Sequence, residues 1–240
     1  MLIDLHAHTS GISRCCRADA PTVLAAARDA GLDGIVLTNH YYKGYITDGD
    51  AAALARAYVD EFYYTEKVGK EMGMTVLYGL EVSMAKHGNV HMLVYGVSPE
   101  FLLERPEIHE LTQEELYREV VAAGGVLVQA HPLRREVNRL LDVKYLHGVE
   151  VNSHPIYHHT HYKEMREVAE QFGLILTSGG DYHADTPYRP VCGSYIPDGT
   201  DTRGLATFLK TTSEIRLKIH EPSTGEVFEV DFTRTGGKAE

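Results

Sequence analysis

The chain has 240 residues and a formal net charge of −11, from 34 acidic residues against 23 Lys and Arg. This balance disfavours long nucleic acid or an anionic membrane surface as a partner, because both favour clustered Lys and Arg. No apolar stretch approaches the roughly 20 residues that span a bilayer, and the start lacks the pattern of a signal peptide. Three cysteines, an odd number, fit a reducing compartment better than a disulfide framework. We therefore expect a cytoplasmic enzyme, with an oligomeric state that the sequence does not specify.

The chain opens with Leu-Ile-Asp-Leu-His-Ala-His over residues 2–8, a short apolar run that ends in His6 and His8. Residues two apart on an extended strand point to the same side, so these two imidazoles converge. Neutral imidazole is a common ligand for zinc-type ions, which makes the pair a candidate metal-binding motif. Taken alone, the pair could also be two loop or core histidines.

The rest of the chain alternates helices with short apolar runs. The first helix begins near Pro21, with Asp19 as its N-cap, and stops at Gly31. Further helices are predicted over residues 50–72, 112–123, 159–172 and 201–211. Between the helices, apolar runs end in a chemically active residue at His40, Glu81, His131 and Asp181.

Near-continuous apolar runs are typical of strands buried on both faces of a parallel sheet. The carboxyl ends of such strands meet on one rim when the sheet closes into a barrel. An open sheet would spread the same side chains along an edge. We therefore predict an α/β fold with a closed (β/α) barrel. The domain prediction is a single unit over residues 1–240, with a core at about 2–220 and an edge strand and tail at 221–240.

Eight side chains form the predicted metal site. They supply six imidazoles and two carboxylates, which suits two or three ions better than one tetrahedral zinc. Ligands of this type favour Mn, Zn or Fe. A water between close ions loses a proton near neutral pH and becomes a nucleophile. The candidate ligands are His6, His8, His40, Glu81, His91, His131, Asp181 and His183.

Six segments in order resemble the motifs of the PHP (polymerase and histidinol phosphatase) family. They are Leu-His-Ala-His-Thr at 5–9, Leu-Thr-Asn-His at 37–40, Gly-Leu-Glu-Val at 79–82, Val-His-Met-Leu-Val-Tyr-Gly at 90–96, Gln-Ala-His-Pro at 129–132 and Gly-Asp-Tyr-His at 180–183. The resemblance spans about residues 2–196. It implies a distorted (β/α)7 TIM-like barrel and a metal-dependent phosphoesterase activity, with catalytic roles for His6, His8, Glu81, Asp181 and His183.

The resemblance also implies how the ions are shared. His6, His8, Glu81 and Asp181 would hold the first ion. Glu81 would bridge to a second ion that is also held by His91 and His131. His40 and His183 would hold the third ion.

The segment after the first histidine pair departs from the family pattern. Many members place an Asp or His there to complete the third site, whereas this chain has Arg14, Cys15 and Cys16. Three side chains, Cys15, Cys16 and Asp19, are alternative third-site ligands. The other alternative is a weak or absent third ion, with Arg14 in contact with phosphate.

Several cationic residues follow the site strands or lie in the last large loop. A guanidinium fork matches phosphate oxygens, so these residues are candidates for binding phosphate, although each could also be a solvated loop charge. The histidines at 154–161 are interpreted as an exposed loop and first helical turn beside the site, with His154 facing substrate. The candidate substrate-binding residues are Arg14, Lys43, Arg134, Arg135, Arg189 and His154.

The function predicted from these features is hydrolysis of a small phosphomonoester, such as histidinol phosphate or a nucleotide, by a metal-activated hydroxide. One alternative is an amidohydrolase-like enzyme that cleaves C–N or C–O bonds. Such enzymes often bridge their metals with a modified lysine, whereas Glu81 takes the bridging position here. The other alternative is a non-catalytic metal-binding module.

Overall fold

One sheet of 11 strands organises the structure. The computed structural model describes residues 1–134, 139–184 and 188–235. Within these ranges, the strands pair in the order β11-β10-β9-β1-β2-β4-β5-β6-β7-β8, and β3 pairs with β4 beside this path. The strands are β1 (Leu2–Ala7), β2 (Gly34–Leu37), β3 (His40–Tyr41), β4 (Thr75–Met84), β5 (Val90–Tyr95), β6 (Val126–Gln129), β7 (Gly148–Asn152), β8 (Ile175–Gly179), β9 (Gly193–Tyr195), β10 (Glu214–Glu221) and β11 (Glu226–Thr233).

The path from β1 to β8 curves into a nearly closed ring of seven strands. The ring closes just beyond β8, where the Asp181 amide donates to the His6 carbonyl at 2.7 Å and Ala7 bridges to Tyr182. The predicted distorted α/β barrel is therefore confirmed.

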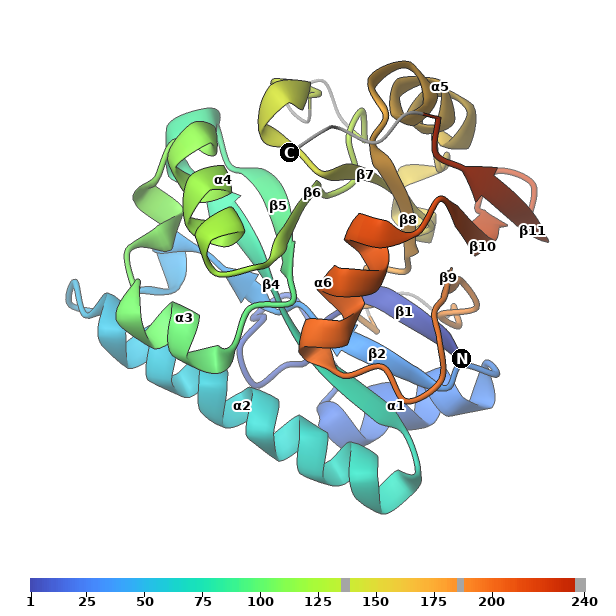
Figure 1. Cartoon of the computed structure of the whole chain (residues 1–240). Helices are drawn as coiled ribbons and strands as arrows, with labels where there is room; N and C mark the ends of the chain where they lie inside the picture. The colour runs from blue at the N-terminus through green and yellow to red at the C-terminus, as the bar shows by residue number, and fades with distance from the viewer. Residues whose placement is uncertain (135–138, 185–187, 236–240) are drawn as a thin grey trace.

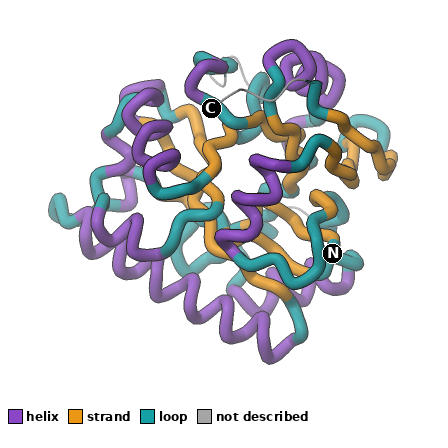
Figure 2. The backbone as a smooth tube through the Cα atoms, in the orientation of Figure 1, coloured by secondary structure: helices purple, strands orange, loops and turns teal. Residues whose placement is uncertain are grey.

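Helices surround the ring (Figures 1 and 2). They are α1 (Ala20–Asp29), α2 (Ala51–Met72), α3 (Pro99–Glu104), α4 (Gln113–Ala122), α5 (Tyr162–Phe172) and α6 (Thr202–Thr211), with 3-10 turns η1 (Lys43–Tyr45), η2 (Ala85–His87), η3 (Ile108–Glu110), η4 (Val143–Tyr145) and η5 (Pro155–Tyr157). The predicted caps are present: Asp19 accepts from the Thr22 amide, and Gly73 ends α2 in the left-handed conformation. The sequence prediction missed α3, because six residues are too few to show a helical period.

The sheet is not parallel throughout. Strand β5 pairs antiparallel with both of its neighbours, β4 and β6. Only residues 85–89 separate β4 from β5, and a parallel pair needs a crossover of a dozen or more residues. The beginning of β5 therefore lies at the rim where the parallel strands end, which brings His91 to that rim although it stands near the start of its strand.

Helix α6 covers the opposite end of the barrel. It lies in front of the ring in Figure 1 and contacts β4, β5 and β6. Gly96 follows β5 with a φ of +77°, and a Cβ there would lie 2.1 Å from the Ala206 Cβ. The close approach of helix and strand thus requires glycine at this position.

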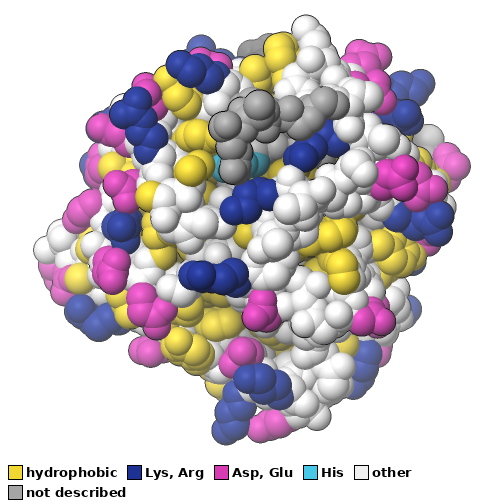
Figure 3. Space-filling model, viewed as in Figure 1, with side chains coloured by type: hydrophobic (Ala, Val, Ile, Leu, Met, Phe, Trp, Pro, Cys, Tyr) yellow, Lys and Arg dark blue, Asp and Glu magenta, His cyan; other side chains and the backbone are white. Residues whose placement is uncertain are grey.

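The face that carries α6 shows mixed charges. Figure 3 shows Lys and Arg side chains scattered among Asp and Glu side chains, without a continuous area of one sign. Among the described helices, none has both the length and the apolar character needed to cross a bilayer.

Candidate metal centre

The eight predicted ligands lie together at the rim where the parallel strands end. His6 and His8 come from β1 and the residue after it, His40 from β3, Glu81 from β4 and His91 from β5. His131 follows β6, and Asp181 and His183 follow β8. The most deeply buried of the eight are His6, His8 and Glu81, each with no exposed surface.

The first group consists of His6, His8, Glu81 and Asp181, whose ligand atoms all lie within 4.8 Å of one another. Nε2 of His6 lies 3.3 Å from a Glu81 oxygen and 3.4 Å from an Asp181 oxygen. Nε2 of His8 lies 3.5 and 3.0 Å from oxygens of the same two carboxylates. Ligand atoms about 2.1 Å from a tetrahedral cation lie roughly 3.4 Å apart, so this spacing fits a metal site.

Two further groups share residues with the first. Glu81 also groups with His40 and His91, and His8 groups with His40 and His183. His91 Nδ1 and His131 Nε2 approach the same Glu81 oxygen, at 2.7 and 2.9 Å. The observed groups differ in two ways from the sets of ligands that the family resemblance implies. His40 lies with Glu81 and His91, and His8 lies with His40 and His183.

Buried polar atoms without a hydrogen-bond partner support a cation at this place. These atoms include His6 Nε2, and also Glu81 Oε2 and His40 Nδ1, which lie against each other as an ion pair. Leaving a buried polar group unsatisfied costs roughly 1–3 kcal/mol. A cation bound to these donor atoms would satisfy them, so the residues present fit a divalent metal.

Backbone strain occurs at two of the candidate ligands. His131 and Asp181 have positive φ angles of 31° and 51°. Such conformations are uncommon for residues other than glycine and concentrate at functional sites. The strained turns aim both side chains into the cluster.

Glu150 on β7 is a site residue that the sequence prediction did not include. Its Oε1 lies 2.8 Å from His6 Nδ1, and its Oε2 accepts from the His131 amide at 2.9 Å. A carboxylate at Nδ1 leaves the Nε2 lone pair of the imidazole for a metal. The sequence did contain an indication of this role, because Glu150 lies inside an apolar strand and burying an unpartnered carboxylate is costly.

Ser13 supports the other side of the cluster. Its hydroxyl lies 3.1 Å from His8 Nδ1, donates to Asn39 Oδ1 at 2.8 Å and accepts from the His40 amide at 3.0 Å. One hydroxyl thus links the segment after β1 to the segment between β2 and β3.

Opposite charges shift the ionisation of the cluster. Burial alone would lower the pKa of His6, but Glu150, Asp181 and Glu81 raise it well above its usual value. Burial alone would raise the pKa of Glu81, but the surrounding histidines lower it well below its usual value. The cluster therefore combines protonated imidazole with ionised carboxylate, and a bound cation would displace protons from it.

Two predicted substrate-binding residues lie beside the cluster. Arg134 pairs with Asp181 Oδ2 at 2.5 Å, contacts the Tyr157 hydroxyl and stacks on the Tyr157 ring at 3.3 Å. His154 is buried, with its ring 5.9 Å from that of His183. The interpretation of its segment as exposed is thus wrong at His154.

The remaining predicted substrate-binding residues lie differently. Arg14 is exposed and its guanidinium lies over the Tyr45 ring at 4.8 Å. Lys43 is engaged by Glu110 at 2.6 Å, and Arg189 is exposed. Arg135 lies outside the described residues.

A cavity of about 240 Å³ opens directly beside the cluster. Its lining includes His40 and His91 together with the side chains of Tyr42, Tyr45, Ser83 and Asn89. This lining is polar and aromatic, and its volume suits a small molecule.

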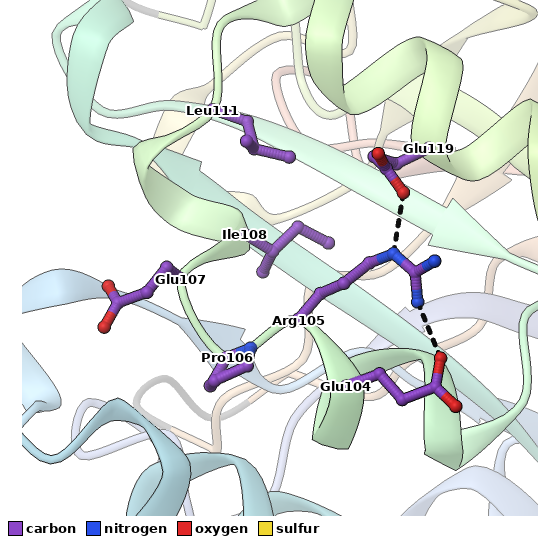
Figure 4. A pocket seen from close by; sticks show the side chains of 7 residues that line it. All are labelled: Glu104, Arg105, Pro106, Glu107, Ile108, Leu111 and Glu119. Atoms are coloured by element: carbon purple, nitrogen blue, oxygen red, sulfur yellow. Dashed lines mark hydrogen bonds and ion pairs between the residues drawn. The ribbon is translucent and has the colours of Figure 1, made fainter.

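A larger cavity, of about 520 Å³, lies away from the cluster beside α3 and α4 (Figure 4). Its cation, Arg105, is held by Glu119 at 2.7 Å and Glu104 at 2.9 Å. Its lining holds three glutamates and one paired arginine and none of the candidate ligands. The smaller cavity, in contrast, is lined by two candidate ligands, His40 and His91.

The fold and the cluster define a barrel protein with a candidate metal centre. No protein-family model matches the chain, and no curated protein matches it. Among solved structures, PsfC from Pseudomonas syringae is similar over 97% of this chain and 91% of that chain, with a TM-score of 0.55 and 16% identity. An amidohydrolase from Chromobacterium violaceum, with bound sulfate and no metal, is similar over 82% of this chain and 93% of that chain, with a TM-score of 0.50 and 17% identity. At these identities the likeness shows the fold alone.

Proposed function

We propose that this protein is a metal-dependent hydrolase that cleaves a small phosphomonoester and uses two or three divalent ions, Mn, Zn or Fe. The observation that carries the proposal is the position of Glu81, which belongs to two of the candidate ion-binding groups. A shared carboxylate is the usual means of holding two ions close together. The ordered motifs of the PHP resemblance favour phosphoester hydrolysis over other metal-assisted reactions.

Bound divalent ions would lower the pKa of a shared water and neutralise the charge that develops at phosphorus. Arg134 would bind the phosphate oxygens, because its guanidinium already holds a carboxylate oxygen of Asp181 beside the cluster. The stacked Tyr157 ring limits its movement. Arg134 would thus orient the phosphate.

His154 has a fixed tautomer when neutral. Its Nδ1 accepts from the Ile156 amide at 3.2 Å, so a neutral ring carries its proton on Nε2. The ring of His154 lies 5.9 Å from that of His183, so His154 would form part of the wall of the site. The cavity beside the cluster would hold the rest of the substrate. Its volume of about 240 Å³ limits the size of that substrate.

The second candidate function is hydrolysis of a C–N or C–O bond. The observation that favours it is the fold likeness to a protein named as an amidohydrolase. The same metal groups and a polar, aromatic cavity would also suit an amide or a lactone. The two candidates therefore differ in substrate and share the metal centre.

A substrate screen with metal analysis on the same sample tests both candidates. We expect metal-stimulated release of inorganic phosphate from small phosphomonoesters, falling to background in Asp181→Asn. A matched control is Asp231→Asn, on an exposed carboxylate that pairs with Arg216, which should keep full activity. Turnover of amides or lactones without turnover of phosphoesters would reject the first candidate in favour of the second, and a metal-free protein that binds no added metal would reject both.

A further inference from the structure

The segment that departs from the PHP pattern, residues 10–17, is held beside the candidate ligand His183 by backbone hydrogen bonds. The Ser10 amide donates to the Ala18 carbonyl at 2.8 Å, the Cys16 amide donates to the Ser13 carbonyl at 2.8 Å, and the Arg17 amide donates to the His183 carbonyl at 2.9 Å. These bonds hold residue 15 in a fixed place beside His183.

Three of the four alternatives for this segment have other partners. The Cys16 thiol is buried and directed at the carbonyls of His8 and Ala18, each at 3.5 Å. Asp19 caps α1 through the Thr22 amide. The Arg14 guanidinium lies over Tyr45 and donates to its carbonyl at 3.2 Å.

Cys15 is the alternative that lies with the imidazoles. Its thiol interacts with the side chains of both His183 and His40, and its sulfur lies 3.9 Å from the Tyr45 hydroxyl. Cys15 is exposed, whereas Cys16 and Cys192 are buried. The thiol is therefore accessible from solvent and directed at the cluster.

When both rings are neutral, as metal binding requires, His40 and His183 would present lone pairs toward the same point. His183 Nδ1 lies 2.6 Å from the Asp181 carbonyl, which only accepts, so a neutral His183 carries its proton on Nδ1 and a lone pair on Nε2. This Nε2 lies 3.3 Å from His40 Nε2. His40 turns its other nitrogen, Nδ1, to Glu81. Two facing ring nitrogens at this distance match neighbouring ligands of one tetrahedral cation.

We propose that Cys15, as a thiolate, joins His40 Nε2 and His183 Nε2 as a ligand of a third divalent ion. The inference rests on the proposed metal centre and goes beyond it, because a sulfur ligand changes which ion the site selects. Thiolate favours zinc or cobalt over manganese, whereas a site of imidazole and carboxylate discriminates less. The third ion would thus be zinc even when the other sites hold manganese.

Cobalt titration of the metal-free full chain tests this inference without measuring activity. A thiolate bound to cobalt gives a charge-transfer absorption in the near ultraviolet, which imidazole and carboxylate ligands do not give. We expect this band in the wild type and in Cys16→Ser. In Cys15→Ser the band should be absent, and the protein should bind about one equivalent of cobalt less than the wild type. Zinc should also protect Cys15 from alkylation, which peptide mapping detects.

Other results of the cobalt titration would overturn the inference. Cobalt binding without the band in the wild type, or a band that persists in Cys15→Ser, overturns the inference and leaves the metal centre intact. A wild-type chain that binds no cobalt overturns the inference together with the proposed function. Because Cys15 is exposed, the serine variant should fold, and circular dichroism checks this.

Discussion

Replacing Glu150 with Gln should weaken metal binding through the tautomer of His6. Oε2 of Glu150 accepts hydrogen bonds from the His131 amide and, at 3.2 Å, from the Asn152 side chain. These two donors would keep the oxygen of the Gln amide at the Oε2 position. The NH₂ group of the amide would then face His6 Nδ1, where Oε1 now lies at 2.8 Å. An NH₂ donor forces Nδ1 to accept, which places the ring proton on Nε2, the candidate ligand atom.

The size of this effect follows from the role of a carboxylate behind a ligating imidazole. Mutating such partners typically costs 10–100-fold in metal affinity, or about 1.4–2.7 kcal/mol. We expect a loss in this range for the tightest ion. Calorimetric titration of the metal-free protein with manganese or zinc measures it directly.

A matched variant controls for the loss of one negative charge. Glu170 on α5 is a glutamate that pairs with Arg166 at the surface, so Glu170→Gln should bind metal like the wild type. A folded Glu150→Gln protein with wild-type metal affinity would refute the tautomer argument. A loss of equal size in Glu170→Gln would show that long-range charge is the cause.

Three further predictions concern pH, phosphate binding and stability. The raised pKa of His6 stabilises the metal-free fold below its usual pKa of 6.5, and this contribution is lost as pH rises toward the folded pKa; the increase in Tm on adding metal should therefore be larger near pH 8 than near pH 6 by scanning fluorimetry, and an equal or smaller increase would contradict this. In Arg134→Met, KM for the phosphoester should rise about 10-fold or more with a smaller change in kcat, because a charge-assisted bond contributes roughly 1.5–3 kcal/mol; an unchanged KM in steady-state kinetics would exclude phosphate binding by Arg134. Tyr58 is buried, with its hydroxyl 2.8 and 2.9 Å from two backbone carbonyls, so Tyr58→Phe should lower the free energy of unfolding in urea by about 1–2 kcal/mol, whereas Tyr63→Phe on an exposed ring should change it little.

The sequence predicts the barrel well because its strand ends are chemically unusual. His40, Glu81, His131 and Asp181 each end or follow an apolar run, and the ring of strands brings them to one rim. Strand direction is harder to predict, because an apolar run looks the same in either direction. The short connection before β5 was the available signal for its reversal, and it explains why His91 reaches the rim from the beginning of a strand.

The finer arrangement of the site depends on tertiary contacts that no local pattern encodes. Lys43 and Arg134 both follow site strands in the sequence, yet Lys43 pairs with Glu110 while Arg134 reaches Asp181. Both are loop cations, so their sequence neighbourhoods do not distinguish them. Burial of His154 likewise depends on packing against residues distant in the chain, such as Tyr188.

Helix α6 has a consequence for the proposed hydrolysis. It packs against three strands at the end of the barrel opposite the ligand cluster, so we expect substrate to reach the cluster from the rim. A phosphoester would arrive and its products would depart on the same side. Inorganic phosphate would then occupy the approach that the next substrate molecule needs, and we expect it to inhibit competitively.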